Sequence, residues 1–192
     1  STSTNSTAWG VYYTAAGTNT NWLRLDSDAS QGNNGGNNVP FTSGAYVRFT
    51  DKVVQIDYLA FAAAGNSQVG YMWHSVPGLQ KFGTFYSNGT TDNAFVELGF
   101  KPKLVFWKFK DNTGGWFLYD SERTTYANGN PLGKYIELNS ANAEGDATPV
   151  VDFLSNGFKV RNNFGGTPQT LVYAAWAEAP SFNLYGGQSN AR

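Results

Sequence analysis

Two pairs of carboxylic acids have a spacing that could serve catalysis. Asp26 and Asp28 lie two residues apart, as do Asp120 and Glu122, and each pair comes just after a tryptophan-bearing segment. In an extended chain such residues share one face, and a glycosidase needs two carboxyl groups several ångströms apart across a sugar. The same pattern arises where an Asp side chain caps the turn after a strand. Because the pattern occurs twice, we interpret both pairs as turn caps.

The sequence does not supply the residues that other common types of catalytic site require. His74 is the only histidine and cysteine is absent, so a nucleophile–histidine arrangement would depend on His74, which has no Gly-x-Ser-x-Gly motif beside it. A zinc site needs more nitrogen or sulfur ligands than the chain supplies, and Asp-Ser-Asp has too few oxygens for calcium. The sequence has no glycine loop for phosphate or dinucleotide binding. It therefore predicts a protein that is not an enzyme and uses no metal or cofactor.

Aromatic residues are the remaining candidates for binding. The chain has 6 Trp, 11 Tyr and 14 Phe, and outside protein cores such rings stack on sugars or fill subunit interfaces. We expect the tryptophans of predicted strands to face the core: Trp9, Trp107, Trp116 and Trp176. The aromatic residues of predicted loops are the candidates for outside contacts: Trp73, Tyr126, Phe182 and Tyr185.

The elements that must position these residues are short strands. Runs rich in Val, Tyr, Phe and Trp alternate with Gly, Asn, Asp and Pro clusters along the chain, which is typical of strands and turns. Alternation over 104–110 places Lys108 and Lys110 away from the core face, and Ser-Asn-Gly at 87–89 and 155–157 predicts hairpin turns. With 41% hydrophobic residues and no sustained helical period, the sequence predicts an all-β fold, a β-sandwich or jelly-roll-like architecture.

A degenerate internal repeat organises the chain. Four motifs of residues 8–64 recur in the same order in residues 103–179, and the second copy carries an insertion before the third motif. The motifs begin at Val11, Trp22, Gly44 and Tyr58 in the first copy, and at Val105, Trp116, Gly157 and Tyr173 in the second. Because the first copy alone would be marginal in size, we expect one composite β domain over residues 1–192, with 65–102 as the bridge.

Charge and hydropathy exclude several partner classes. The net charge is −1, which gives no attraction to nucleic acid or an anionic membrane surface, and no apolar run approaches the length of a membrane span. The polar start Ser1–Ser6 predicts a fragment or a processed product. With 14% charged residues, no cysteine and many aromatic residues, we expect a homo-oligomer that buries aromatic surface between copies.

Residues 80–192 carry an ordered set of further motifs. These are FGTFYSNG at 82–89, FVELGFKP at 95–102, WFLYDSER at 116–123, DFLSNGFKVR at 152–161, YAAWAE at 173–178 and NAR at 190–192. Together they resemble a β-rich C-terminal domain common in marine bacteriophage virion proteins of the tail-fibre or appendage type.

This resemblance implies a bacteriophage virion structural protein, outside the cell, whose distal tail-fibre or appendage domain contacts a glycan or protein of the host surface. It implies a homotrimer that assembles with other virion proteins, and no catalytic residues. Two alternatives stay open. One is a capsid-surface decoration protein of a phage, and the other is a secreted carbohydrate-binding module or glycosidase.

The insertion in the second copy is where we expect ligand contacts. Loops at one end of a β-sandwich carry recognition, and this one holds Tyr126, Asn128 and Asn130. An amide can both donate to and accept from sugar hydroxyl groups, while a tyrosine can stack on the ring. We therefore predict ligand binding at these three residues and at Trp73, with the Asn-rich loop 31–38 as a further position. Ordinary turn chemistry is the alternative interpretation of the two asparagines.

Overall fold

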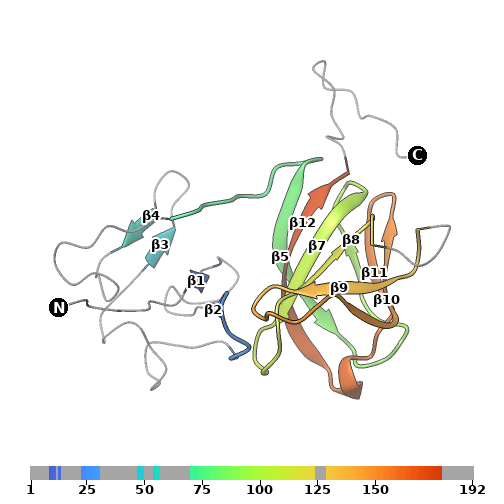
Figure 1. Cartoon of the computed structure of the whole chain (residues 1–192). Coiled ribbons are helices and arrows are strands. Elements are labelled where there is room, and N and C mark those ends of the chain that lie inside the picture. The colour runs from blue at the N-terminus through green and yellow to red at the C-terminus, as the bar shows by residue number, and fades with distance from the viewer. Residues whose placement is uncertain are drawn as a thin grey trace, which may run out of the picture.

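The computed structural model describes residues 9–11, 13, 23–30, 47–49, 54–56, 70–123 and 129–178 (Figure 1). Within these ranges the regular structure is β-strand, apart from a three-residue 3-10 helix, η2 (Phe164–Gly166). The all-β prediction is therefore confirmed. No helix in the same ranges is long and apolar enough to cross a membrane.

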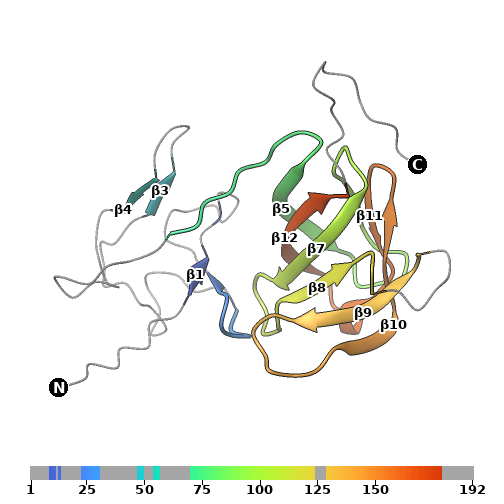
Figure 2. The same ribbon diagram turned by 45° about the horizontal axis from the view of Figure 1, so that its top comes forward.

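One large antiparallel sheet dominates the described residues. Its eight strands follow the order β5-β12-β7-β8-β9-β10-β11-β6. Their bounds are β5 (Gln80–Ser87), β6 (Phe95–Glu97), β7 (Pro102–Phe109), β8 (Phe117–Asp120), β9 (Leu132–Glu137), β10 (Gly145–Leu154), β11 (Gly157–Val160) and β12 (Gln169–Ala177). The sheet curls into a nearly closed barrel (Figures 1 and 2). Across the seam, the Lys81 ammonium group on β5 donates to the Glu97 carbonyl oxygen on β6 at 2.7 Å.

The inward face of this sheet forms the main core. On β7 the alternation places Val105 and Trp107 inside, where both are fully buried, and Trp107 packs against Tyr119 of β8 with ring centroids 4.7 Å apart. Phe85 and Phe158, from β5 and β11, meet edge to face at 5.7 Å across the interior. Burial of such large side chains is the dominant stabilising contribution in folding, so this interior holds the barrel together.

A second, smaller core lies on the outer face of the same sheet. The two-stranded ladder of β1 (Gly10–Val11) and β2 (Leu23–Arg24) packs there, and Leu23 is buried against Trp116 and Val172. The Trp116 indole N–H donates to the Arg24 carbonyl oxygen at 2.7 Å. The β1–β2 ladder is therefore a cover for part of the outer face of the barrel.

Lys108 lies beneath this cover. The alternation correctly predicts that its side chain leaves the barrel interior, but Lys108 is nevertheless fully buried. Its ammonium group donates to the Gly114 carbonyl oxygen and lies 5.9 Å from the centre of the Trp116 ring. The Gly114 amide in turn donates to the Asp28 carbonyl oxygen at 2.8 Å, which links the cover to the β7–β8 connection.

The two predicted hairpin turns have different outcomes. Ser155 and Asn156 join β10 to β11, with Leu154 paired to Gly157, so this hairpin is confirmed. The segment 87–89 does not form a hairpin between paired strands, because β5 and β6 lie at opposite edges of the sheet. It begins the connection that crosses the seam of the barrel, and Gly89 takes a positive φ of 75° there.

The predicted repeat and the single composite domain stay predictions. In the first copy the structure describes β1 and β2 and a separate ladder of β3 (Val47–Phe49) with β4 (Val54–Ile56). The remaining motifs of that copy lie largely outside the described residues.

Candidate functional site

The predicted loop site is only partly within the described residues. Tyr126, Asn128 and the loop 31–38 lie outside them, as do Phe182 and Tyr185. Asn130 is described, and its amide is bound to the backbone of β10. Its Nδ2 donates to the Phe153 carbonyl oxygen at 2.8 Å, and its Oδ1 accepts from the Phe153 amide at 2.9 Å. This geometry favours the structural interpretation of Asn130.

The two carboxylate pairs are held by neighbouring donors. Asp120 Oδ1 accepts from the amides of Glu122 and Arg123, both at 3.0 Å, and Asp120 Oδ2 accepts from the Arg123 guanidinium group at 2.6 Å. This is the turn cap that the sequence predicts. Asp26 instead reaches back and accepts from the Trp9 amide at 3.3 Å, while Ser27 Oγ caps its own turn by accepting from the Ala29 amide.

His74 is exposed and has a local partner. Its Nδ1 lies 3.0 Å from the carbonyl oxygen of the next residue, Ser75. Among the described residues, no three histidine, aspartate or glutamate side chains gather into a group that could hold a metal ion.

Three exposed aromatic rings form a continuous surface that we call the aromatic ledge: Trp9, Tyr71 and Trp73. Their exposed fractions are 54%, 65% and 61%. Tyr71 and Trp73 are stacked, with centroids 6.0 Å apart and ring planes at 21°, and Trp9 lies 6.4 Å from Tyr71. The prediction that Trp9 faces the core is wrong, because Trp9 precedes the short strand β1 and its ring packs beside Tyr71. Trp73 is available for outside contacts, as its loop position suggests.

Hydrogen bonds attach the ledge to the barrel. The Gln80 amide group donates to the His74 carbonyl oxygen at 2.8 Å and accepts from the Trp176 indole N–H at 3.1 Å. Ser75 Oγ accepts from the Phe82 amide at 3.1 Å. The segment that carries Tyr71 and Trp73 is therefore tied to β5 immediately after the ledge.

A charged pair lies beside Trp9. The Leu25 amide donates to the Trp9 carbonyl oxygen at 2.9 Å, and Asp26 accepts from the Trp9 amide. Arg24 binds the Asp26 carboxylate at 3.1 Å, and both side chains are partly exposed. Burial on its own would raise the pKa of Asp26, but hydrogen bonds from Arg24 and the Trp9 amide, together with the Arg24 charge, lower it. The ledge thus has an ionised carboxylate next to it, which can accept from hydroxyl groups.

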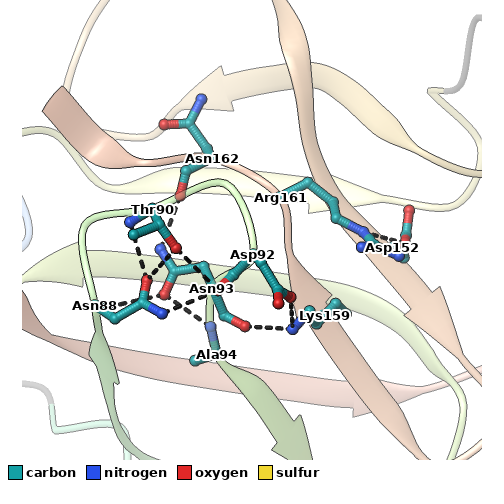
Figure 3. A network of polar contacts seen from close by, with 9 residues as sticks. All are labelled: Asn88, Thr90, Asp92, Asn93, Ala94, Asp152, Lys159, Arg161 and Asn162. Atoms are coloured by element: carbon teal, nitrogen blue, oxygen red, sulfur yellow. Dashed lines mark hydrogen bonds and ion pairs between the residues drawn. The ribbon is translucent and has the colours of Figure 1, made fainter. Parts of the chain in front are cut away.

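A network of polar contacts ties the seam of the barrel (Figure 3). Asn93 is buried, and its Nδ2 donates to Ser87 Oγ at 2.7 Å and to the Asn162 carbonyl oxygen at 2.8 Å, while its Oδ1 accepts from the amides of Asn88 and Ala94. All of its amide groups are therefore satisfied within the fold. Such a residue has a structural role rather than a binding role.

The sequence interpretation missed Tyr71 and the contribution of Trp9 to a surface. One signal was available. Residues 71–73 are Tyr-Met-Trp, a run of large apolar side chains without the alternation of a half-buried strand, and all three are exposed. Such runs on a surface mark interaction sites.

Comparison with known proteins places the chain in a family. Residues 1–180 match a family described as a domain of unknown function, DUF7483. The chain belongs to this family. No curated protein and no solved structure matches the chain significantly. For this DUF7483 chain, the geometry above is therefore the basis on which a function can be argued.

Proposed function

We propose that this chain is the host-contacting domain of a bacteriophage virion protein, of the tail-fibre or appendage type, and that it binds a bacterial surface glycan through the aromatic ledge. The observation that carries the binding proposal is the stack of Trp9, Tyr71 and Trp73, three large rings that are more than half exposed. Water-exposed aromatic surface is unfavourable unless a partner covers it. The motifs of residues 80–192 that resemble phage virion domains support the virion location.

The chemistry of the ledge suits a sugar. The apolar face of a sugar ring can stack on Tyr71 or Trp73, while its hydroxyl groups need acceptors and donors close by. Asp26 and Arg24 supply both beside Trp9. A single platform of this kind gives weak binding, and several copies in a fibre multiply it by avidity.

The proposal is for binding without catalysis. Asp120 is bound by two amides and a guanidinium group, which is the arrangement of a turn cap. The His74 side chain has one hydrogen bond among those described, with its neighbour's carbonyl oxygen. An Asp120→Asn variant should therefore bind glycan as the wild type does. If the wild type releases reducing sugar from the bound polysaccharide and the Asp120→Asn variant does not, the glycosidase alternative is favoured instead.

The test is an array of bacterial surface polysaccharides probed with the purified chain and two variants. Trp73→Ala should weaken binding to the strongest hit about tenfold, which corresponds to about 1.4 kcal/mol. The matched control is Tyr86→Ala, since Tyr86 is exposed to 63% and is not part of the ledge. Equal glycan binding by the Trp73→Ala and Tyr86→Ala variants would overturn the proposal that the ledge binds the glycan. Mass spectrometry of purified virions tests the location separately.

A further inference from the structure

The aromatic ledge is assembled from two parts of the chain. Tyr71 and Trp73 belong to the segment that leads into β5 and is tied to that strand. Trp9 is attached to the cover instead, because its carbonyl oxygen accepts from the Leu25 amide at 2.9 Å and its amide donates to Asp26. The two parts lie on the same side of the barrel (Figures 1 and 2), and they meet where Trp9 contacts Tyr71. Trp9 therefore completes the ledge only while the cover is docked on the barrel.

The cover is held on the barrel by a small apolar cluster and by hydrogen bonds to its backbone. Leu23 is buried against Trp116, and the Trp116 indole N–H donates to the Arg24 carbonyl oxygen at 2.7 Å. Just after β2, the Asp28 carbonyl oxygen accepts from the Gly114 amide at 2.8 Å. A segment held by few buried apolar contacts opens at a lower free energy than a core strand does. A single group beneath the cover can therefore bias its docking.

Lys108 is such a group. It pairs with Val172 of β12, which belongs to the apolar cluster under the cover, and it is fully buried. Its ammonium group donates to the Gly114 carbonyl oxygen and lies 5.9 Å from the centre of the Trp116 ring. This described acceptor is a backbone carbonyl rather than a carboxylate. One carbonyl oxygen and one aromatic face replace the hydration of an ammonium group only in part.

The carboxylates that act on Lys108 come from two sides. Asp28 follows β2, and Glu137 ends β9. Their negative charges favour the ammonium form, but burial has the larger effect and lowers the pKa of Lys108 to about 8. The side chains that flank Lys108 on the neighbouring strands and their connections, Val172 and Trp116, are uncharged. Docking of the cover is therefore more compatible with the neutral amine than with the ammonium ion.

The other described ionisable groups near Lys108 are paired or stay neutral. On the cover, Arg24 binds Asp26 at 3.1 Å. Burial, with the charge of Asp111 as a second cause, raises the pKa of the Tyr13 hydroxyl, so this group keeps its proton well into the alkaline range. At the end of β7, Lys110 lies 4.0 Å from Asp111. Lys108 is thus the described group under the cover that changes its charge just above neutral pH.

The direction of the effect follows from proton binding. With the cover released, the Lys108 ammonium group is hydrated and titrates at the usual lysine value; with the cover docked, it titrates lower. Between the two pKa values the released state binds more protons, so docking becomes more favourable as the pH rises.

We propose that Lys108 is a positioning residue for the ledge: its neutral form lets the cover dock and hold Trp9 against Tyr71, and its ammonium form favours release of the cover. The ledge is then regulated by pH through a residue that does not touch the ligand. The consequence for glycan binding rests on the proposed function, whereas the effect on the cover does not.

Hydrogen exchange of the full chain at pH 7 and pH 9.5 tests the effect on the cover. The reporters are the Leu25 amide and the Trp116 indole N–H, which donate to Trp9 and Arg24. Their protection, relative to an unstructured chain at the same pH, should rise about tenfold or more in the wild type. Lys108→Met, which is never charged, should give high protection at both pH values. An equal rise in the wild type and in Lys108→Met would overturn the proposal.

Lys108→Arg is the matched variant, because it keeps a positive charge at both pH values. It should give low protection at pH 7 and at pH 9.5, so that the wild type moves from the behaviour of Lys108→Arg to that of Lys108→Met. If Lys108→Arg does not fold, the comparison with Lys108→Met decides alone. The internal control is the Trp176 indole N–H, which donates to Gln80 away from the cover and should not differ among the three proteins. A parallel change at Trp176 would contradict a role specific to the cover.

The ledge itself gives the second readout. The nuclear Overhauser effect between the Trp9 and Tyr71 rings should strengthen from pH 7 to pH 9.5 in the wild type and stay constant in Lys108→Met. Affinity for the strongest polysaccharide hit should rise in the same proportion as the protection of the cover. If no polysaccharide binds, the proposed function fails and hydrogen exchange alone decides the role of Lys108. Glycan affinity that does not follow the protection of the cover would contradict the regulation of the ledge.

Discussion

At the scale of single residues, Lys108 lies on the face of β7 that alternation predicts, but its side chain is buried. Its side chain leaves the barrel interior but lies beneath the N-terminal cover, beside Trp116. Burial lowers the pKa of its ammonium group to about 8, although the charges of Asp28 and Glu137 oppose this shift. Between that pKa and the usual lysine value, the unfolded chain binds more protons than the folded chain. The contribution of Lys108 to stability therefore rises with pH across this window.

The pH dependence of unfolding tests this interpretation. We expect the free energy of unfolding of the wild type, relative to Lys108→Met, to increase by about 2 kcal/mol between pH 7 and pH 9.5, since one unit of pKa shift corresponds to about 1.4 kcal/mol. Urea unfolding of both proteins at several pH values measures this difference. A difference that is independent of pH would show that the ammonium group is not desolvated in the folded chain.

Asn130 leads to a second prediction for a single side chain. Removing its amide leaves the buried Phe153 amide and carbonyl oxygen without these partners, and unsatisfied buried groups cost about 1–3 kcal/mol. Asn130→Ala should therefore lower the free energy of unfolding by that amount while glycan binding per folded molecule stays the same. The exposed Asn142 gives the control Asn142→Ala, which should be neutral. Loss of binding in a stable Asn130→Ala variant would instead restore the sequence-based assignment.

At the scale of elements, the pairing of β11 with β6 should be sensitive to a single Cβ atom added at Gly157. Gly157 passes so close to β6 that a Cβ would lie 2.1 Å from the Val96 carbonyl oxygen. The obstacle is backbone, so Gly157→Ala must displace the strand and should cost about 1–3 kcal/mol. Gly70→Ala is the control, because a Cβ there meets nothing within 4 Å. Thermal unfolding compares the two, and equal melting temperatures would contradict this edge of the barrel.

Elements of this fold are predictable from the sequence to different degrees. Alternation identifies which side chains of β7 enter the core, and the Ser-Asn-Gly segment at 155–157 marks a true hairpin. The same tripeptide at 87–89 does not, because the partner of β5 is β12, which follows about 80 residues later in the chain. Likewise, nothing local to Trp9 indicates that it stacks on Tyr71. Contacts between distant segments decide these cases, and a single sequence does not show them.

At the scale of the whole molecule, the described surface retains large apolar side chains outside the ledge. Leu79, Phe95 and Leu138 are exposed to between 39% and 47%. Together with the low charge content, this surface supports the proposal that the chain assembles with copies of itself as a trimer. Sedimentation equilibrium should give three times the mass of 20.9 kDa. A stable monomer at high micromolar concentration would contradict the proposed assembly.

The central claim is that the aromatic ledge of Trp9, Tyr71 and Trp73 holds a bacterial surface glycan. The most direct measurement is the indole region of the ¹H–¹⁵N NMR spectrum during titration with the strongest polysaccharide hit. We predict that the Trp9 and Trp73 indole signals shift as the glycan binds, while the buried Trp107 and Trp116 signals stay in place. Binding that leaves the Trp9 and Trp73 signals unchanged would contradict the account and move the glycan site to another surface.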